Sequence, residues 1–92
     1  MTQFDRDMKE VGNLLKRYRH NRGISQASVA RQIEVSLGYI AQIENANKIP
    51  SLGVLHRLCG FYGVPLSDVF AMAEEMADRT MRELMAVPSI KL

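Results

Sequence analysis

Apolar residues recur at steps of three and four along most of the chain, as on one face of an α-helix. In the first segment Met8, Val11 and Leu15 keep this spacing, and no stretch shows the sustained alternation of a strand. The pattern predicts five helices, over residues 5–21, 26–33, 37–45, 52–62 and 66–87. We therefore expect an all-α fold.

Small polar residues and glycines mark the expected helix ends. Ser25 and Ser36 precede the second and third helices, and Pro50-Ser51 precedes the fourth, as is typical of N-terminal caps. Gly23 and Gly63 follow the first and fourth helices, where a left-handed residue commonly ends a helix. These signals predict short helices with tight connections.

The connection between the second and third helices is the most informative. Only Glu34, Val35 and Ser36 join them, so the two must cross steeply, as in a helix-turn-helix. Ile40 and Ile43 would support the third helix from below and leave its other face free for a DNA major groove. From this pattern alone, a generic bundle of short helices is an equally good interpretation.

The length of 92 residues is enough for one small domain. The single Cys59 excludes an internal disulfide, and the longest apolar run, residues 69–73, is far shorter than the roughly 20 residues of a membrane span. Asp5, Asp7 and Glu10 occupy the region where a secretory signal would be apolar. We expect a cytoplasmic protein without a membrane segment.

Charge is distributed unevenly along the chain. Residues 1–65 carry nine basic and five acidic side chains, whereas residues 66–92 carry three basic and five acidic ones. The segment between Val11 and Ile33 contains five basic residues and no acid: Lys16, Arg17, Arg19, Arg22 and Arg31. Such a local excess is expected of a surface that faces phosphates, although a solvated helix face would look the same.

Catalytic chemistry is disfavoured by the residues present. His20 and His56 are far apart in the sequence, and the chain contains no HExxH, CxxC, GxxxxGK[ST] or GxSxG motif. We expect neither an enzyme nor a cofactor or metal site.

Several short motifs occur together in a fixed order. They are Arg19 with Gly23, SQxxxA from Ser25 to Ala30, SxxYI from Ser36 to Ile40, IEN from Ile43 to Asn45, and Pro50-Ser51. In this order and at these separations, residues Val11 to Phe70 resemble the phage repressor and Cro-like helix-turn-helix regulators, also called the xenobiotic-response-element type.

The resemblance implies a five-helix, lambda-repressor-like domain over residues 1–70, with residues 71–92 as an extension of the fifth helix and a short tail. It further implies a transcriptional regulator that binds double-stranded DNA as a homodimeric repressor and reads a palindromic operator through the helix at 37–45. It also implies an ion pair between Arg19 and Glu44, which would fix the recognition helix against the first helix.

The resemblance also suggests which residues contact DNA. Base readout would fall to the outward positions of the third helix: Leu37, Gly38, Tyr39 and Gln42. Leu37 offers only apolar contact, with a thymine methyl as the obvious partner, and Gly38 offers only close backbone approach. Gln42 could bridge an adenine edge, whereas Tyr39 could reach a base or a phosphate or pack against the domain. Phosphate contacts would come from Gln26, Ser36, Asn45, Asn47 and Lys48, with Arg17 and Arg22 as further candidates.

Two positions depart from the family pattern. Glu34 stands in the turn where glycine is common, and Ala46 stands where glycine usually ends the third helix. A non-glycine residue in a left-handed conformation costs on the order of 1 kcal/mol. We therefore expect either differently shaped loops or Asn47 in the left-handed position.

The fifth helix carries an apolar stripe that is longer than a small domain can cover by itself. The opposite face of this helix carries the pairs Glu75–Arg79 and Asp78–Arg82 at i,i+4 spacing. We expect a symmetric second copy to cover the stripe. The interface would contain Phe61, Met72, Ala73, Met76, Ala77, Thr80, Met81 and Leu84. One alternative is a helix folded back on its own domain. Another is an antitoxin-like or adaptor regulator, whose methionine-rich helix binds a different protein.

Overall fold

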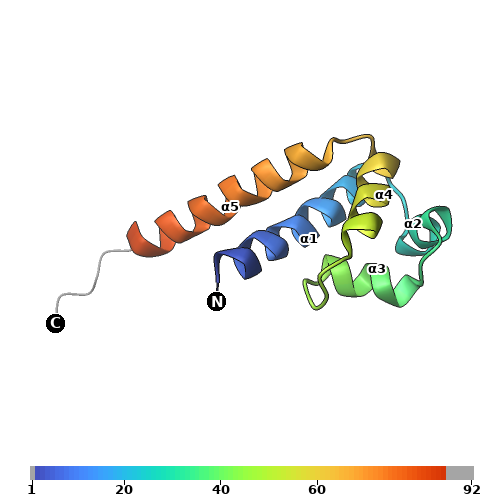
Figure 1. Cartoon of the computed structure of the whole chain (residues 1–92), viewed down its shortest axis with the longest axis horizontal. Coiled ribbons are helices and arrows are strands. Elements are labelled where there is room, and N and C mark those ends of the chain that lie inside the picture. The colour runs from blue at the N-terminus through green and yellow to red at the C-terminus, as the bar shows by residue number, and fades with distance from the viewer. Residues whose placement is uncertain (1, 87–92) are drawn as a thin grey trace.

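The computed structural model describes residues 2–86 and contains five helices, drawn in Figure 1. They are α1 (Gln3–Asn21), α2 (Gln26–Ile33), α3 (Leu37–Glu44), α4 (Leu52–Tyr62) and α5 (Leu66–Ala86). No strand occurs among the described residues, so the predicted all-α fold is confirmed. Within residues 2–86, no helix has the length and apolar character needed to cross a membrane.

Serine hydroxyls cap the N-terminal ends of α2, α3 and α4, as the sequence predicts. The Oγ atoms of Ser25, Ser36 and Ser51 each accept a hydrogen bond from the backbone N–H three residues ahead. Each bond satisfies one of the backbone donors that a helix start leaves without a partner. The predicted starts of α2, α3 and α4 agree with the structure, whereas α3 ends at Glu44, one residue before the predicted end.

The first helix begins at Gln3, two residues before its predicted start. Thr2 caps it: its hydroxyl accepts the N–H of Asp5 at 3.1 Å, and the Asp5 carboxylate accepts the N–H of Thr2 at 3.3 Å. These bonds hold the pKa of Asp5 below its ordinary value, since they favour the ionised carboxylate. The Thr-x-x-Asp pattern therefore lengthens α1 at its N-terminus.

The core is formed by buried side chains from all five helices. Its largest fully buried side chains include Leu14 and Leu15 of α1, Ile40 and Ile43 of α3, and Leu55 of α4. Ile40 and Ile43 thus support α3 from below, as the spacing predicts. The core fixes one face of α3 and leaves the opposite face at the surface.

The fifth helix folds back along α1 of the same chain, and the two run side by side (Figure 1). The pair is antiparallel, because Tyr18 near the end of α1 contacts Met72 near the start of α5, whereas the N-terminal part of α1 lines a cleft with the far end of α5. That cleft, of about 480 Å³, is lined by Arg6, Lys9, Glu10, Ala77, Thr80, Met81 and Leu84.

This packing corrects part of the expected dimer interface. Ala73 and Ala77 are fully buried within the single chain and offer no surface to a second copy. The apolar stripe of α5 is covered by α1 over these turns, as in the alternative of a helix folded back on its own domain. Residue 87, the predicted end of this helix, lies outside the described residues.

Two non-glycine residues adopt the left-handed conformation. Glu34 (φ 60°, ψ 50°) ends α2, and Ala46 (φ 60°) follows α3. Both expected alternatives, differently shaped loops or a left-handed Asn47, are wrong, because Glu34 and Ala46 themselves adopt the left-handed conformation that glycine would take there. Both residues therefore carry backbone strain at the two connections of α3.

Candidate nucleic-acid interface

A buried ion pair joins the end of α1 to the end of α3. Arg19 Nε donates to Glu44 Oε2 at 2.8 Å, and Arg19 Nη2 donates to Glu44 Oε1 at 2.9 Å. The two residues are 8% and 4% exposed. The hydrogen bonds to Glu44 raise the pKa of Arg19. This is the pairing that the resemblance implies, in the bidentate geometry that fixes orientation as well as distance.

The ion pair extends into a network that also holds α2. Arg19 Nη1 donates to the carbonyl of Ile24 at 2.9 Å, and Gln26 Nε2 donates to Glu44 Oε1 at 3.0 Å. The Glu44 carboxylate thus accepts three hydrogen bonds, from α1 and from the first residue of α2. Because an amide nitrogen carries two hydrogens, Gln26 keeps one donor for another acceptor.

Two residues that sequence reasoning missed also position the reading unit, the pair of helices α2 and α3. Gly12 lies where a Cβ would stand 2.5 Å from the carbonyl oxygen of Ile43, so α1 and α3 approach more closely than any side chain would allow. Arg57 of α4 donates to the carbonyl of Ile33 at 2.6 Å, at the end of α2. A glycine inside an apolar helical pattern is a signal that could have identified Gly12. The sequence offers no comparable signal for Arg57.

The outward face of α3 carries little polar chemistry in its first turn. Leu37 is 51% exposed, Gly38 is exposed, and nothing lies within 4 Å of the place where a Cβ of Gly38 would stand. Gln42 is exposed one turn further along. Three of the four expected base-reading residues therefore lie exposed on α3: Leu37, Gly38 and Gln42.

Tyr39 differs from the other three. It is half-buried and packs against the core, and its hydroxyl accepts the backbone N–H of Ser51 at 3.2 Å. The Lys48 ammonium lies 5.3 Å from the centroid of its ring. Tyr39 thus packs against the domain, which is one of the alternatives that the sequence leaves open: its side chain connects α3 to the start of α4, and its O–H hydrogen remains available to donate. A role of Tyr39 in base readout stays a prediction.

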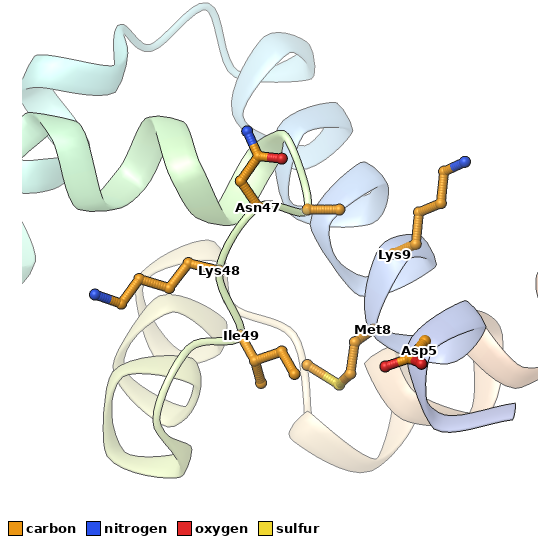
Figure 2. Close-up of a pocket in the computed structure, with 7 residues that line it drawn as sticks. Asp5, Met8, Lys9, Asn47, Lys48 and Ile49 are labelled. Carbon is orange, nitrogen blue, oxygen red and sulfur yellow. The ribbon is translucent and has the colours of Figure 1, made fainter. Parts of the chain in front are cut away.

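The loop after α3 carries the expected phosphate cluster. Asn45, Asn47 and Lys48 are exposed, and residues 46–49 line a cleft of about 660 Å³ with Asp5, Met8 and Lys9 of α1. Figure 2 shows Lys9 and Lys48 extending away from this cleft in different directions, while Met8 and Ile49 approach each other. Asn47 and Lys48 are thus held at the surface just beyond α3, as the phosphate assignment requires.

The two arginines expected near phosphate have different surroundings. Arg22 donates to the carbonyls of Tyr18 and Tyr62, and its guanidinium lies within 6 Å of both tyrosine ring centroids. Arg22 is exposed, and its donors connect α1 to the end of α4. Its phosphate assignment stays a prediction. Arg17 is exposed, and its side chain forms no hydrogen bond or ion pair within the described residues.

The remaining residues of the expected dimer interface are partly accessible. Met72, Thr80 and Leu84 are exposed, and Leu84 is 64% exposed. Met76 and Met81 are half-buried, and Phe61 packs edge-on against Tyr62 at a centroid distance of 5.3 Å. The Thr80 hydroxyl donates to the backbone carbonyl of Met76. The ion pairs Glu75–Arg79 and Asp78–Arg82 lie at the surface, with N···O distances of 3.3 and 3.6 Å.

Comparison with known proteins gives consistent matches. A family model described as a helix-turn-helix domain matches residues 10–71. The transcriptional regulator ClgR of Mycobacterium tuberculosis is 35% identical over 79 residues, which cover 86% of this chain and 70% of that protein. The immunity repressor protein of Bacillus phage phi105 is 30% identical over 77 residues, covering 79% of this chain and 54% of that protein.

A solved structure agrees with these matches. The crystal structure of the clp gene regulator ClgR from Corynebacterium glutamicum superposes with a TM-score of 0.76 at 26% sequence identity. The superposition covers 86% of each chain. The similarity therefore extends beyond α2 and α3 to most of the molecule.

Proposed function

We propose that this chain, which belongs to the helix-turn-helix family of DNA-binding transcriptional regulators, acts as a homodimeric repressor that reads a palindromic operator. One observation carries the proposal. The exposed face of α3 is held from behind by the buried pair Arg19 and Glu44, so its outward side chains have a fixed orientation. A recognition helix needs this rigidity to read base edges in a major groove.

Base readout is assigned to three residues of α3. Gln42 would bridge the N6 and N7 atoms of an adenine, Leu37 would contact an apolar base group, and Gly38 would let the backbone approach the groove. Since only one of the three is a polar side chain, we expect modest direct readout, with a further contribution from DNA shape.

Phosphate contact is assigned to helix starts and to the loop after α3. Gln26 and Ser36 lie at the N-terminal ends of α2 and α3, where backbone N–H groups attract anions. Asn45, Asn47 and Lys48 follow α3 at the surface, and Arg17 is an exposed cation on α1. If two or three cations per subunit touch phosphate, log affinity should fall with log salt at a slope of about −4 to −5 for a dimer.

Selection from a random duplex pool followed by fluorescence anisotropy tests this function. Gln42→Ala should weaken binding to the selected duplex by about 1–3 kcal/mol and relax the preference at one position of each half-site. Gln32→Ala, an exposed glutamine near the end of α2, should leave the affinity unchanged. Salt-independent binding, or equal affinity of Gln42→Ala and the unaltered protein, would contradict the proposal.

The homodimer is assigned to apolar surface left exposed on α5. Met72, Leu84 and Met85 are exposed there, although α1 of the same chain covers Ala73 and Ala77. Binding of both subunits to a palindrome requires the two α3 helices to lie about 34 Å apart, one turn of DNA. Such a spacing matches two half-sites of a palindrome.

Light scattering of two variants tests the dimer. Leu84→Glu should yield a monomer, because it places a charge in the proposed contact, whereas Leu52→Glu on α4 should stay dimeric. A monomeric unaltered protein would contradict the homodimer and favour a different protein partner for the methionine-rich helix. Repression is tested separately: a reporter promoter containing the selected sequence should lose expression when the chain is present.

A further inference from the structure

The first turn of α3 presents hydrocarbon where a polar side chain would be needed to hydrogen-bond a base. Leu37 is half-exposed, and Gly38 beside it has no side chain. The neighbouring hydroxyls are oriented toward the domain, since the Ser36 hydroxyl accepts the N–H of Tyr39 and the Tyr39 hydroxyl accepts the N–H of Ser51. Leu37 is therefore the apolar side chain through which this turn can discriminate between bases.

Base edges in the major groove offer one kind of apolar group, the methyl on C5 of thymine. Gly38 favours contact with it, because the open space beside its Cα lets the backbone of α3 come close to the groove. A leucine cannot detect the O4 of thymine or the amino group of cytosine by hydrogen bonding. The contact would thus respond to the methyl group and not to the hydrogen-bonding identity of the base.

We propose that Leu37 recognises the 5-methyl group of a pyrimidine, so that thymine and 5-methylcytosine are both accepted and unmethylated cytosine is not. The inference rests on the proposed binding of duplex DNA and names the feature that one end of α3 reads there. Burying one methyl group corresponds to about a fourfold change in affinity. A dimer with two equivalent contacts would change by about fifteenfold. Methylation of cytosine at this position would then strengthen binding.

Replacing thymine by deoxyuridine removes the methyl group and leaves every hydrogen-bonding atom in place. The probe is the full-length duplex selected from the random pool, with each thymine replaced in turn in both half-sites. We expect one replacement to weaken binding of the unaltered chain by about fifteenfold in fluorescence anisotropy. The same replacement should have no effect on Leu37→Ala, which lacks the contacting side chain.

The chain offers a matched control for this variant. Leu52 follows the capping Ser51 at the start of α4 as Leu37 follows Ser36 at the start of α3, and it is 67% exposed. Leu52→Ala makes the same chemical change at the same helix position on a different helix. It should keep the full penalty for deoxyuridine. Circular dichroism should show both variants folded, since both leucines lie at the surface.

A second arm separates the methyl group from the rest of the base. Duplexes with cytosine or 5-methylcytosine at the sensitive position differ by the methyl alone. The unaltered chain should bind the methylated duplex more tightly, by about fifteenfold when both half-sites carry it, and Leu37→Ala should bind the two equally.

The outcomes distinguish the two levels of the proposal. If deoxyuridine weakens the unaltered chain and Leu37→Ala equally at every position, or weakens neither, the methyl contact of Leu37 is wrong while DNA binding stands. A selected half-site without any thymine overturns the inference in the same way. If the full chain retains no duplex from the pool, the proposed function fails and the inference fails with it.

Discussion

The unit that carries α2 and α3 and the pair formed by α1 and α5 are held together in different ways. Helices of eight residues are too short to be stable alone, and a few polar atoms around Glu44 orient α2 and α3. The longer α1 and α5 pack through apolar side chains such as Val11, Val69 and Ala73. Orientation in the first unit depends on specific hydrogen bonds in addition to buried side chains such as Ile40 and Ile43, whereas in the second it depends on area and shape.

This contrast predicts that single polar substitutions have unequal effects in the two regions. The largest is expected for Glu44→Ala, which leaves Arg19 buried without its carboxylate partner. The free energy of unfolding should fall by about 3–5 kcal/mol in chemical denaturation. DNA affinity should fall as well, because α3 loses its attachment to α1.

Glu75→Ala is the matched control in the other region. Glu75 pairs with Arg79 at 3.3 Å, but both side chains are more than 60% exposed. Removing this carboxylate should change the free energy of unfolding by less than about 0.5 kcal/mol. Equal effects of the two substitutions would remove the distinction between the regions.

The close approach of α1 and α3 gives the next largest effect. Gly12→Ala places a methyl group against the carbonyl of Ile43, and the strain should outweigh the better helix propensity of alanine. We expect a loss of about 1–2 kcal/mol in the free energy of unfolding. Gly60→Ala on α4 meets no neighbour and should instead gain about 0.5–1 kcal/mol. A gain for both variants would show that the helices can separate at no cost.

Glycine at the left-handed positions should stabilise the protein. Glu34→Gly and Ala46→Gly each relieve a positive φ, and the gain should exceed the extra chain entropy of glycine by about 0.5–1 kcal/mol. Asn47→Gly, at a neighbouring position without a positive φ, should not stabilise. Thermal denaturation of the three variants checks the sign, and a higher melting temperature for Asn47→Gly alone would place the left-handed residue at 47.

The smallest effect at neutral pH is expected for Tyr62→Phe. The Tyr62 hydroxyl is buried and has no hydrogen-bond partner among residues 2–86, so its removal should change the free energy of unfolding by less than about 0.5 kcal/mol. Tyr39→Phe, which removes the acceptor of the Ser51 N–H, should cost about 0.5–1.5 kcal/mol.

Alkaline pH separates Tyr62 from a simple apolar residue. Burial raises the pKa of Tyr62 to about 12, above the value of about 10 in the unfolded chain. The folded state favours the protonated hydroxyl, so stability is fully present below pH 10 and falls as the pH rises toward 12. Tyr62→Phe should lack this part of the loss. Identical pH profiles for the two proteins would show that the hydroxyl reaches water when it ionises.

The sequence predicts the reading unit well because its signals are local. Ser25, Ser36 and Ser51 act as caps where expected, and the motif around Arg19 and Glu44 leads to the ion pair that the structure contains. Each signal involves a hydrogen bond within a turn or a pairing that the family resemblance supplies.

The packing of α5 is the part that the sequence analysis assigned differently. The predicted first helix, residues 5–21, is only two residues shorter than α1, so its length does not explain the difference; the sequence leaves open that α1 and α5 run antiparallel and side by side. With 19 residues α1 is about 28 Å long and covers α5 as far as Ala77. An apolar stripe alone does not reveal whether the covering surface belongs to the same chain.

Arg22 shows a second limit. A run of basic residues does not indicate which of them finds carbonyl and ring partners, and the Tyr62 carbonyl that holds Arg22 lies 40 positions away in the sequence. Ala46 differs, because its left-handed conformation goes with local hydrogen bonds: the N–H of Ala46 donates to the carbonyl of Ile43 and the N–H of Asn47 to that of Gln42, as is common where a helix ends.

The central claim is that the exposed face of α3 enters duplex DNA, and an NMR titration with the selected duplex tests it most directly. The account predicts that the largest amide shift changes occur at residues 36–48 and at the start of α2, around Gln26. Changes confined to α5, with the amides of Leu37, Gly38 and Gln42 unmoved, would contradict it.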